Sequence, residues 1–299
     1  MNNKSLFQHT KSETAIYIKS PINYIGGKYK LLPQIIPLFP KNINTFVDLF
    51  GGSGTVLMNV VANNYIYNDI NFYVADIIKG IFTTPYNNII DSINKIISDY
   101  NLSMTNKDGF EKLKTFYNKG NREWIILFTL MCYSFNHQFR FNNNHEYNSS
   151  FGKNRAYFSE RQKQDLFALK KRFKENENQI DVISKSAFNI DFSILGDNDF
   201  IYLDPPYLNS LGNYNDGKRG FEGWTTIHEN NLHELLNELT LNNIKWAMSN
   251  NLKKNDNLKK FIITNNYTIH YIEHSYSNCN YHKKDRSVND DVEVLITNY

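Results

Sequence analysis

The chain has 299 residues, with 33 Lys and Arg against 30 Asp and Glu, a formal net charge of +3 and two cysteines. This length suits one large domain or one domain with an insertion, and two cysteines exclude a disulfide framework and a four-ligand zinc site. Residues 1–20 lack the apolar core of a signal peptide, and no run approaches the roughly eighteen apolar residues of a membrane helix, so we expect a cytoplasmic protein.

The first motif is a Gly-Gly turn before a predicted helix, in residues 21–32 (PINYIGGKYKLL). A phosphate-binding P-loop needs a glycine four residues before its Gly-Lys pair, and Ser or Thr after the pair. Ile22 and Tyr29 occupy those positions, which makes a nucleoside triphosphatase a poor interpretation. The turn instead presents Lys28 beside Tyr24 near the start of a helix.

A strand, a glycine turn and a helix are predicted next. The β-like run 44–49 precedes the turn 50–54 (FGGSG), and the apolar residues of 55–61 have helical spacing. Glycines permit a tight turn and close approach of the backbone to a ligand. Leu57 stands where the dinucleotide fingerprint has its third glycine, so a nucleoside is favoured over a pyrophosphate.

A second strand, 65–67, ends at Asn68 and Asp69. A carboxylate at that place can accept hydrogen bonds from both ribose hydroxyls, although a polar cap on a strand end explains Asp69 equally well by itself. Residues 88–135 then carry apolar side chains at helical intervals, so a helical block interrupts the α/β pattern. Strands are expected again at 180–183, 200–203, 245–248, 267–272 and 292–297.

Basic and aromatic residues gather in one segment. Residues 134–174 hold nine basic and three acidic residues, an excess larger than the net charge of the whole chain. Seven Phe and Tyr residues are interleaved with them between 135 and 158. This mixture is typical of a surface that binds phosphates and inserts rings among bases. An exposed helix face with a hydrophobic stripe explains 161–174 better than it explains 135–158.

Residues 199–207 (DFIYLDPPY) are a short apolar strand that ends on an acid, two prolines and an aromatic ring. Two prolines remove two backbone donors and fix two φ angles, which leaves the Asp204 carboxylate and the Pro205 carbonyl as fixed acceptors. With the flat face of Tyr207, they suit the exocyclic amino group of a base. A proline-rich turn after a strand is the alternative for this motif alone.

Three further residues have weaker signals. Phe188 follows the strand 180–183, where it could lie against a bound adenine or equally well pack in the core. His228 and His233 flank a helix that begins after residues 225–226, and we interpret both as surface or capping residues. No third ligand has suitable spacing, so no metal site is predicted.

Taken together, the chain resembles the adenine-N6-specific DNA methyltransferases of the alpha group, a Dam-like family that includes many restriction-modification enzymes. The resemblance covers nearly the whole chain. Four elements match in family order, namely the N-terminal cofactor motif, the first Rossmann-like motif, the catalytic tetrapeptide and the closing strand, at 21–32, 46–54, 204–207 and 293–299.

The resemblance implies an α/β fold of the Rossmann-like class I methyltransferase type, with a mostly parallel twisted sheet. Residues 1–86 and 179–299 would form the domain that binds S-adenosyl-L-methionine, and 87–178 an inserted helical and hairpin domain for target recognition. The implied catalytic residues are Asp204, Pro205, Pro206 and Tyr207. The implied cofactor-binding residues are Tyr24, Gly27, Lys28, Asp48, Phe50, Gly51, Gly52, Gly54, Asp69, Phe188 and Asp204.

Residues 135–142 and 147–152 look like the two arms of the family's DNA-reading hairpin. Arg140 is the best candidate for a base contact because arginine matches guanine in a bidentate way. Gln138 and Ser150 replace an aliphatic residue and a proline of the GATC-reading members, so GATC is not the expected site. The expected DNA-binding residues, two of them on a mobile loop at 208–224, are Phe135, Asn136, Gln138, Arg140, Asn142, Ser150, Lys153, Lys218 and Arg219.

The expected reaction is therefore site-specific methylation of adenine N6 in double-stranded DNA, with the target base flipped out of the duplex. A cognate restriction endonuclease is the expected partner, and neither a metal nor a membrane is expected. Three alternatives stay open: a methyltransferase for cytosine N4 or RNA adenine, a catalytically silent DNA-binding protein of the same fold, and a metabolic methyltransferase. Asp rather than Ser at 204 disfavours cytosine, and a metabolic enzyme leaves the basic aromatic insertion unexplained.

Overall fold

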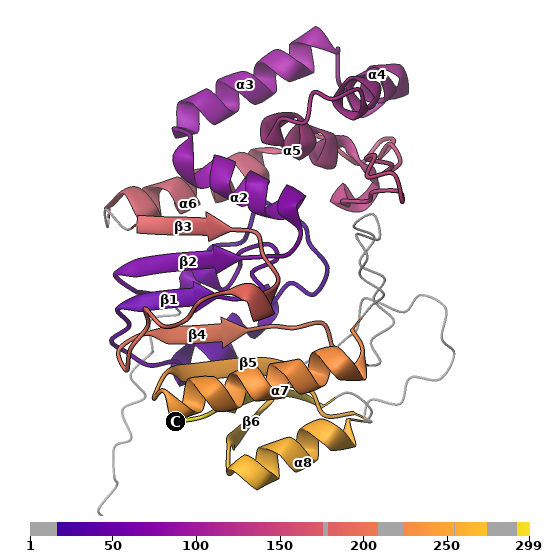
Figure 1. Cartoon of the computed structure of the whole chain (residues 1–299). Coiled ribbons are helices and arrows are strands. Elements are labelled where there is room, and N and C mark those ends of the chain that lie inside the picture. Colours follow the sequence, from indigo (N-terminus) through magenta and orange to yellow (C-terminus); the bar gives the residue numbers. More distant parts are fainter. Residues whose placement is uncertain (1–16, 176–178, 209–223, 254, 274–291) are drawn as a thin grey trace, which may run out of the picture.

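The computed structural model describes residues 17–175, 179–208, 224–253, 255–273 and 292–299, and a seven-stranded sheet forms its centre (Figure 1). The strands lie in the order β3-β2-β1-β4-β5-β7-β6. β1 to β5 are parallel, and β7 runs antiparallel to both β5 and β6. This confirms the predicted α/β fold with a mostly parallel sheet. The bounds are Thr45–Asp48 (β1), Asn64–Asn68 (β2), Gln179–Ile183 (β3), Phe200–Leu203 (β4), Lys245–Asn251 (β5), Thr268–Ile272 (β6) and Glu293–Thr297 (β7).

The direction of strand order reverses between β1 and β4. β1 pairs with β2 on one side and with β4 on the other, so Asp48 lies opposite both Tyr67 and Tyr202. In open parallel sheets, ligands bind outside the carboxyl ends of the strands at such a switch point. The residues that follow β1, β2 and β4 therefore lie where a ligand is expected to bind.

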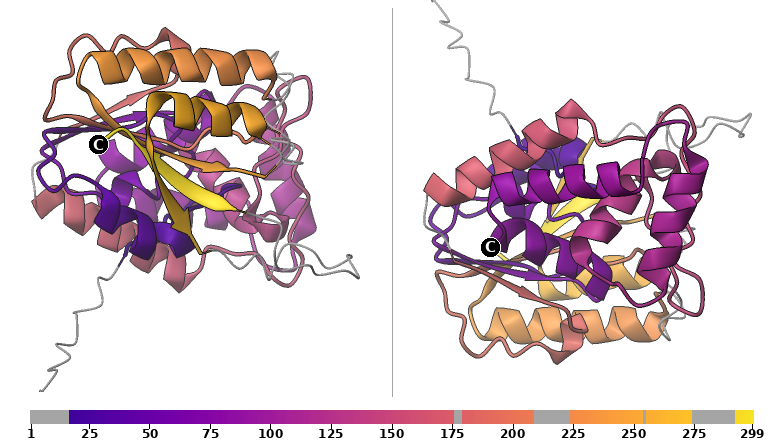
Figure 2. Two further views of the ribbon diagram at one scale, coloured as in Figure 1. Left: turned by 90° about the horizontal axis from the view of Figure 1, so that it is seen from below. Right: turned by 90° about the horizontal axis from the view of Figure 1, so that it is seen from above.

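Helices cover both faces of the sheet (Figure 2). Alternating side chains of each strand enter different cores, because successive residues of a strand point to opposite faces. Phe46 and Tyr202 belong to the core under α1 (Leu32–Ile35), α2 (Phe72–Thr83) and α6 (Glu160–Glu175). Val47 and Ile201 belong to the core under α7 (Thr226–Leu241) and α8 (Asp256–Asn265).

The predicted helical block is present beyond the β3 edge of the sheet (Figure 1). It consists of α3 (Tyr86–Asp99), α4 (Lys107–Asn118) and α5 (Trp124–Tyr133). Residues 125–133 of α5 are all buried, since α5 contacts α2, α3 and α4. Short 3₁₀ turns complete the described elements at Tyr29–Leu31, Ile36–Leu38, Leu57–Asn59, Phe135–His137 and Ala187–Asn189.

Helix α6 lies within the predicted insertion 87–178 but returns to the sheet. The ring of Phe173 lies 5.2 Å from that of Tyr65 in β2, and the Arg172 guanidinium donates to the carbonyl of Val60 at 2.7 Å. One continuous hydrophobic core joins this face of the sheet to the helical block. The division into two domains at 86 and 178 stays a prediction, and α6 contacts both the sheet and α3.

The prediction of a helix over 55–61 is wrong. The structure has only the 3₁₀ turn Leu57–Asn59, after which Val60 is extended. The Asn59 side chain replaces the helical backbone bond, because its Nδ2 donates to the carbonyl of Thr55 at 2.7 Å while its backbone N–H donates to Val56. β-Branched residues in this run lower its helix propensity further.

The two histidines lie inside α7 rather than beside it. His228 is a capping residue as predicted, since its Nδ1 accepts from the Thr225 backbone at 3.2 Å. His233 is not at the surface: it is buried, and its ring stacks on Phe261 with centroids 3.9 Å apart. Across the described parts of the chain, no helix combines the length and the apolar character needed to cross a bilayer.

Candidate active site

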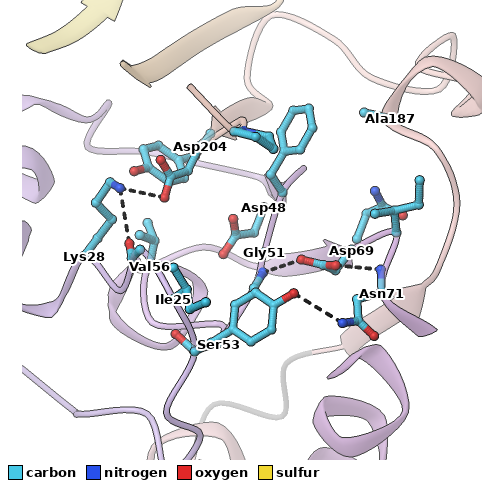
Figure 3. A pocket seen from close by; sticks show the side chains of 18 of the residues that line it. Ile25, Lys28, Asp48, Gly51, Ser53, Val56, Asp69, Asn71, Ala187 and Asp204 are labelled. Atoms are coloured by element: carbon cyan, nitrogen blue, oxygen red, sulfur yellow. Dashed lines mark hydrogen bonds and ion pairs between the residues drawn. The ribbon is translucent and has the colours of Figure 1, made fainter. Parts of the chain in front are cut away.

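A cavity of about 270 Å³ lies at the carboxyl ends of the parallel strands (Figure 3). Parallel strands end at the same edge of the sheet, so the segments that follow β1, β2, β3 and β4 all reach the cavity. Ten of the eleven residues predicted for the cofactor line it, namely Tyr24, Gly27, Lys28, Asp48, Phe50, Gly51, Gly52, Asp69, Phe188 and Asp204.

The glycine turn passes close to the end of β2. The Gly51 N–H donates to the carbonyl of Asn68 at 2.7 Å, and a Cβ at Gly51 would lie 2.2 Å from the ring of Tyr67. Gly52 has φ near +49°, a conformation that favours glycine. Gly54 was predicted to bind the cofactor, but it is not among the described residues that line the cavity. Its N–H instead closes the turn by donating to the carbonyl of Gly51.

Asp69 joins the glycine turn to the end of β2. One carboxylate oxygen accepts from the Gly52 N–H at 2.8 Å and the other from the Asn71 N–H at 2.7 Å (Figure 3). The Asn71 side chain in turn donates to the Tyr24 hydroxyl at 3.3 Å. Each carboxylate oxygen has two lone pairs, so Asp69 can accept from a ligand as well.

Asp48 is a buried carboxyl group on the wall of the cavity. Burial raises its pKa to about 8; the N–H of Leu57 opposes this rise, and the charges of Asp204 and Asp69 add to it. Desolvation favours the neutral form of a carboxyl group. Asp48 therefore keeps its proton to a higher pH than an ordinary carboxyl group does.

Lys28 and Asp204 form an ion pair across the cavity, with Nζ and Oδ2 2.8 Å apart (Figure 3). The Lys28 ammonium also donates to the carbonyl of Gly26 at 3.2 Å. Burial raises the pKa of Asp204, while the charge of Lys28, its hydrogen bond to the carboxylate and the nearby Tyr207 hydroxyl oppose the rise. The Asp204 side chain keeps 19% of its surface exposed, so a ligand in the cavity can reach it.

The other three residues of the tetrapeptide differ in whether they line the cavity. Pro206 lines the cavity, whereas Pro205 and Tyr207 are not among the described residues that line it. The Tyr207 hydroxyl donates to Oε1 of Glu293 at 2.7 Å, and its ring centroid lies 5.4 Å from the Lys28 ammonium. Burial and the nearby charges of Asp204 and Glu293 raise the pKa of Tyr207 well above its usual range.

Sequence reasoning missed Trp224, which lines the cavity two residues before α7 begins. Its ring meets Phe50 edge to face at 5.9 Å and lies 6.3 Å from that of Phe188. Its indole N–H donates to the buried carboxylate of Glu229 at 2.7 Å, and Glu229 also accepts from Asn255 at 2.9 Å. Nothing in the sequence pattern distinguishes Trp224 from the predicted loop that it ends.

The two predicted hairpin arms pair in the structure. Antiparallel bridges join Ser134 to Phe151 and Phe141 to Tyr147. Exposed residues along the arms and beside them are Phe135, Asn136, Arg140, Ser150 and Lys153, while Gln138 and Asn142 are half-buried. Lys218 and Arg219 lie outside the described residues, as does the loop 209–223.

The aromatic residues between 135 and 158 include both core residues and exposed residues. Phe141, Tyr147 and Phe158 are buried in the core, so they do not form part of a surface as predicted. Phe135 is 47% exposed. The carbonyl of Asn136 accepts from the Asn23 side chain at 2.7 Å, which connects the hairpin to the turn that carries Tyr24.

The family described as "D12 class N6 adenine-specific DNA methyltransferase" matches residues 24–289. The chain is 43% identical over 303 aligned positions to modification methylase StsI of Streptococcus sanguinis, covering 99% of this chain and 45% of that protein. It is 44% identical over 291 positions to type II methyltransferase M.FokI of Planomicrobium okeanokoites, covering 97% and 44%.

A third relative, modification methylase LlaI of Lactococcus lactis subsp. lactis, is 35% identical over 282 positions, which cover 94% of this chain and 43% of that protein. The chain thus spans less than half the length of these three relatives. The matched residues include the N-terminal turn, the glycine turn and the tetrapeptide that surround the cavity. The chain belongs to the D12 class of N6 adenine-specific DNA methyltransferases.

Proposed function

We propose that this chain methylates N6 of adenine at a specific site in double-stranded DNA, with S-adenosylmethionine as methyl donor. The observation that carries the proposal is the Asp204 carboxylate. It follows β4 at the switch point, pairs with Lys28 and remains accessible from the cavity. The tetrapeptide of an N6 adenine methyltransferase family thus meets a cavity suited to a nucleoside.

The residues that line the cavity fit the cofactor. Aromatic rings of Tyr24, Phe50 and Phe188 offer apolar faces to an adenine, and Asp69 ends β2 where a carboxylate can bind ribose hydroxyls. A cation would offset the desolvation that raises the pKa of Asp48 and Asp204. S-adenosylmethionine supplies such a cation, a sulfonium group that carries an electrophilic methyl.

The chain's own contribution is alignment and polarisation of the target amine. The lone pair of an aromatic amine is delocalised into the ring, so the amine is a weak nucleophile. Acceptors at Asp204 and the Pro205 carbonyl would bind both N–H groups and localise that pair on nitrogen. Fixed dipoles in a water-poor site are effective because they need no reorganisation during the reaction.

The hairpin supports double-stranded DNA as the substrate. Arg140 and Lys153 are exposed on it and beside it, and so is Phe135, which precedes the Asn136 whose carbonyl contacts Asn23 in the turn that carries Tyr24. Extrusion of a base costs a few kcal/mol, which contacts to the flipped base and the vacated gap offset. We propose the predicted DNA-binding residues as this interface, and a restriction endonuclease with the same recognition site as the partner.

The test is methylation of unmethylated genomic DNA with tritiated S-adenosylmethionine, followed by single-molecule sequencing for N6-methyladenine. We expect modified adenines in one short motif. Asp204→Ala should reduce transfer by at least about 100-fold while calorimetry still detects cofactor binding, because it removes an acceptor used in the transition state. Asp197→Ala, at an exposed position, is the matched control.

Two kinds of result would overturn the proposal, and a third would change its mechanism. Absence of both cofactor binding and label in DNA would favour a silent DNA-binding protein. Cofactor binding without label in DNA, or label in RNA or on cytosine N4, would point to another substrate or to a missing partner. Turnover by Asp204→Ala at the unmodified rate would remove Asp204 from the mechanism.

A further inference from the structure

Glu293 is a buried carboxylate next to the tetrapeptide, although it comes from the last strand of the chain. Its side chain is only 3% exposed, and its Oε1 accepts the Tyr207 hydroxyl at 2.7 Å. The same oxygen lies 3.9 Å from the Lys28 ammonium. It is not among the described residues that line the cavity, and it reaches the site through its contacts with Tyr207 and Lys28.

The antiparallel direction of β7 brings Glu293 to this place. Glu293 is the first residue of β7 and lies opposite Asn251, the last residue of β5. In a parallel strand the first residue would lie at the opposite edge of the sheet. The reversed strand therefore adds a carboxylate from its amino end to the edge where the cavity is.

Two acceptors compete for the single proton of the Tyr207 hydroxyl. Glu293 accepts it at 2.7 Å, and both carboxylates lie beside the same ammonium, with Nζ of Lys28 3.9 Å from Oε1 of Glu293 and 2.8 Å from Oδ2 of Asp204. The nearby Tyr207 hydroxyl also lowers the pKa of Asp204. Asp204 already binds Lys28 at 2.8 Å. If the hydroxyl also turned to Asp204, the carboxylate would have fewer lone pairs for the target amine.

We propose that Glu293 is a positioning residue that holds the Tyr207 hydroxyl away from Asp204, so that the Asp204 carboxylate stays open to the amine of the substrate. The proposal rests on the methyl-transfer function proposed above. Glu293 acts through Tyr207 and touches neither the substrate nor the cofactor. Its role depends on accepting one hydrogen bond, which a neutral amide oxygen can do as well.

The test compares single-turnover methyl transfer in variants of the full chain. Glu293→Ala should slow transfer by about 10-fold or more, the scale of one lost interaction between coupled residues. Glu293→Gln should recover the rate to within about threefold, since its carbonyl oxygen still accepts from Tyr207. The dissociation constant for the cofactor, measured by calorimetry, should stay within about twofold in both, because Glu293 lies outside the cavity.

The second arm is a rescue. Tyr207→Phe in the Glu293→Ala background should raise the rate at least about fivefold, because no hydroxyl then competes for Asp204. Glu238→Gln, at an exposed position of α7, is the control for loss of a carboxylate elsewhere. If Glu293→Ala does not fold, Glu293→Met fills the buried space without a strong acceptor and takes its place in both arms.

The outcomes separate this inference from the proposed function. If the unmodified chain transfers no methyl group, the proposed function fails. If it does, unchanged transfer by Glu293→Ala, failure of Glu293→Gln to recover the rate, or a double variant as slow as Glu293→Ala would each overturn the positioning role.

Discussion

The ammonium group of Lys28 and the carboxylate of Asp204 lie 2.8 Å apart, although one follows the N-terminal turn and the other follows β4. The pair sets the charge on the proposed catalytic carboxylate. Burial raises the pKa of Asp204, and Lys28 counters part of that rise. A lysine in this position keeps Asp204 ionised to lower pH than burial alone would allow.

Lys28→Met should therefore move the acidic limb of the pH–rate profile for methyl transfer to higher pH. Without the ammonium, the pKa of Asp204 rises further, and the carboxylate form that accepts from the amine is lost at a higher pH. Single-turnover rates across the acidic range measure the shift. Lys30→Met, at an exposed position of the next turn, should leave the limb in place. An unmoved limb in Lys28→Met would assign it to another group.

Asp48→Asn should change how stability depends on pH. The folded-state pKa of Asp48 is about 8, above its ordinary value of 3.8, so the folded protein binds the proton more tightly than the unfolded chain does. The stabilisation that comes from this tighter proton binding is complete below the unfolded-state pKa of 3.8. It is lost as the pH rises towards 8, by at most about 1.4 kcal/mol per pH unit. The Asn variant lacks this loss.

Urea unfolding at pH 5 and pH 7 measures the effect. The free energy of unfolding of the unmodified chain should fall relative to that of Asp48→Asn between these two values, whatever other groups titrate in both proteins. The amide can still accept from the Leu57 N–H, which bonds Asp48 at 3.2 Å. A constant difference between the two proteins would show that Asp48 is ionised throughout this range.

Arg140→Ala should relax the recognition site at one position. Arg140 is exposed on the hairpin, and a guanidinium contact to guanine contributes about 1–3 kcal/mol of discrimination. Methylation maps of genomic DNA by single-molecule sequencing would show additional motifs that differ at one base. Arg155→Ala removes an exposed arginine from the same segment and should weaken binding without new motifs. Unchanged site preference in Arg140→Ala would make Arg140 a phosphate contact.

Glu229→Ala should destabilise the protein and weaken cofactor binding together. The variant leaves the Trp224 indole N–H and the Asn255 amide without the buried acceptor that they share, at a cost of about 3 kcal/mol. Trp224 lines the cavity, so its displacement should raise the dissociation constant for S-adenosylmethionine. Urea unfolding and calorimetry measure the two effects, with the exposed Glu234→Ala as control. Native cofactor affinity in Glu229→Ala would remove Trp224 from the proposed site.

Much of the cavity could be predicted from the sequence because it depends on strand ends. Asp48, Asp69 and Asp204 each follow or end an apolar run, and parallel strands bring such positions to one edge. The glycine turn was predictable for a similar local reason, since Gly52 adopts a positive φ. Local patterns failed at 55–61, where the Asn59 side chain takes the carbonyl that a helix would use.

The sequence by itself determined most of the strands and the polar residues at their ends, because these follow from short patterns along the chain. The mostly parallel sheet and the hairpin arms were expected from the resemblance to the family. Only the tertiary structure decided the partners of these residues. Glu293 reaches Tyr207 because β7 is reversed within the sheet, and Trp224 faces Phe50 because a buried carboxylate in α7 holds its indole. The contacts of Glu293 with Tyr207 and of Trp224 with Phe50 join segments far apart in the chain, and their geometry depends on packing that no local pattern encodes.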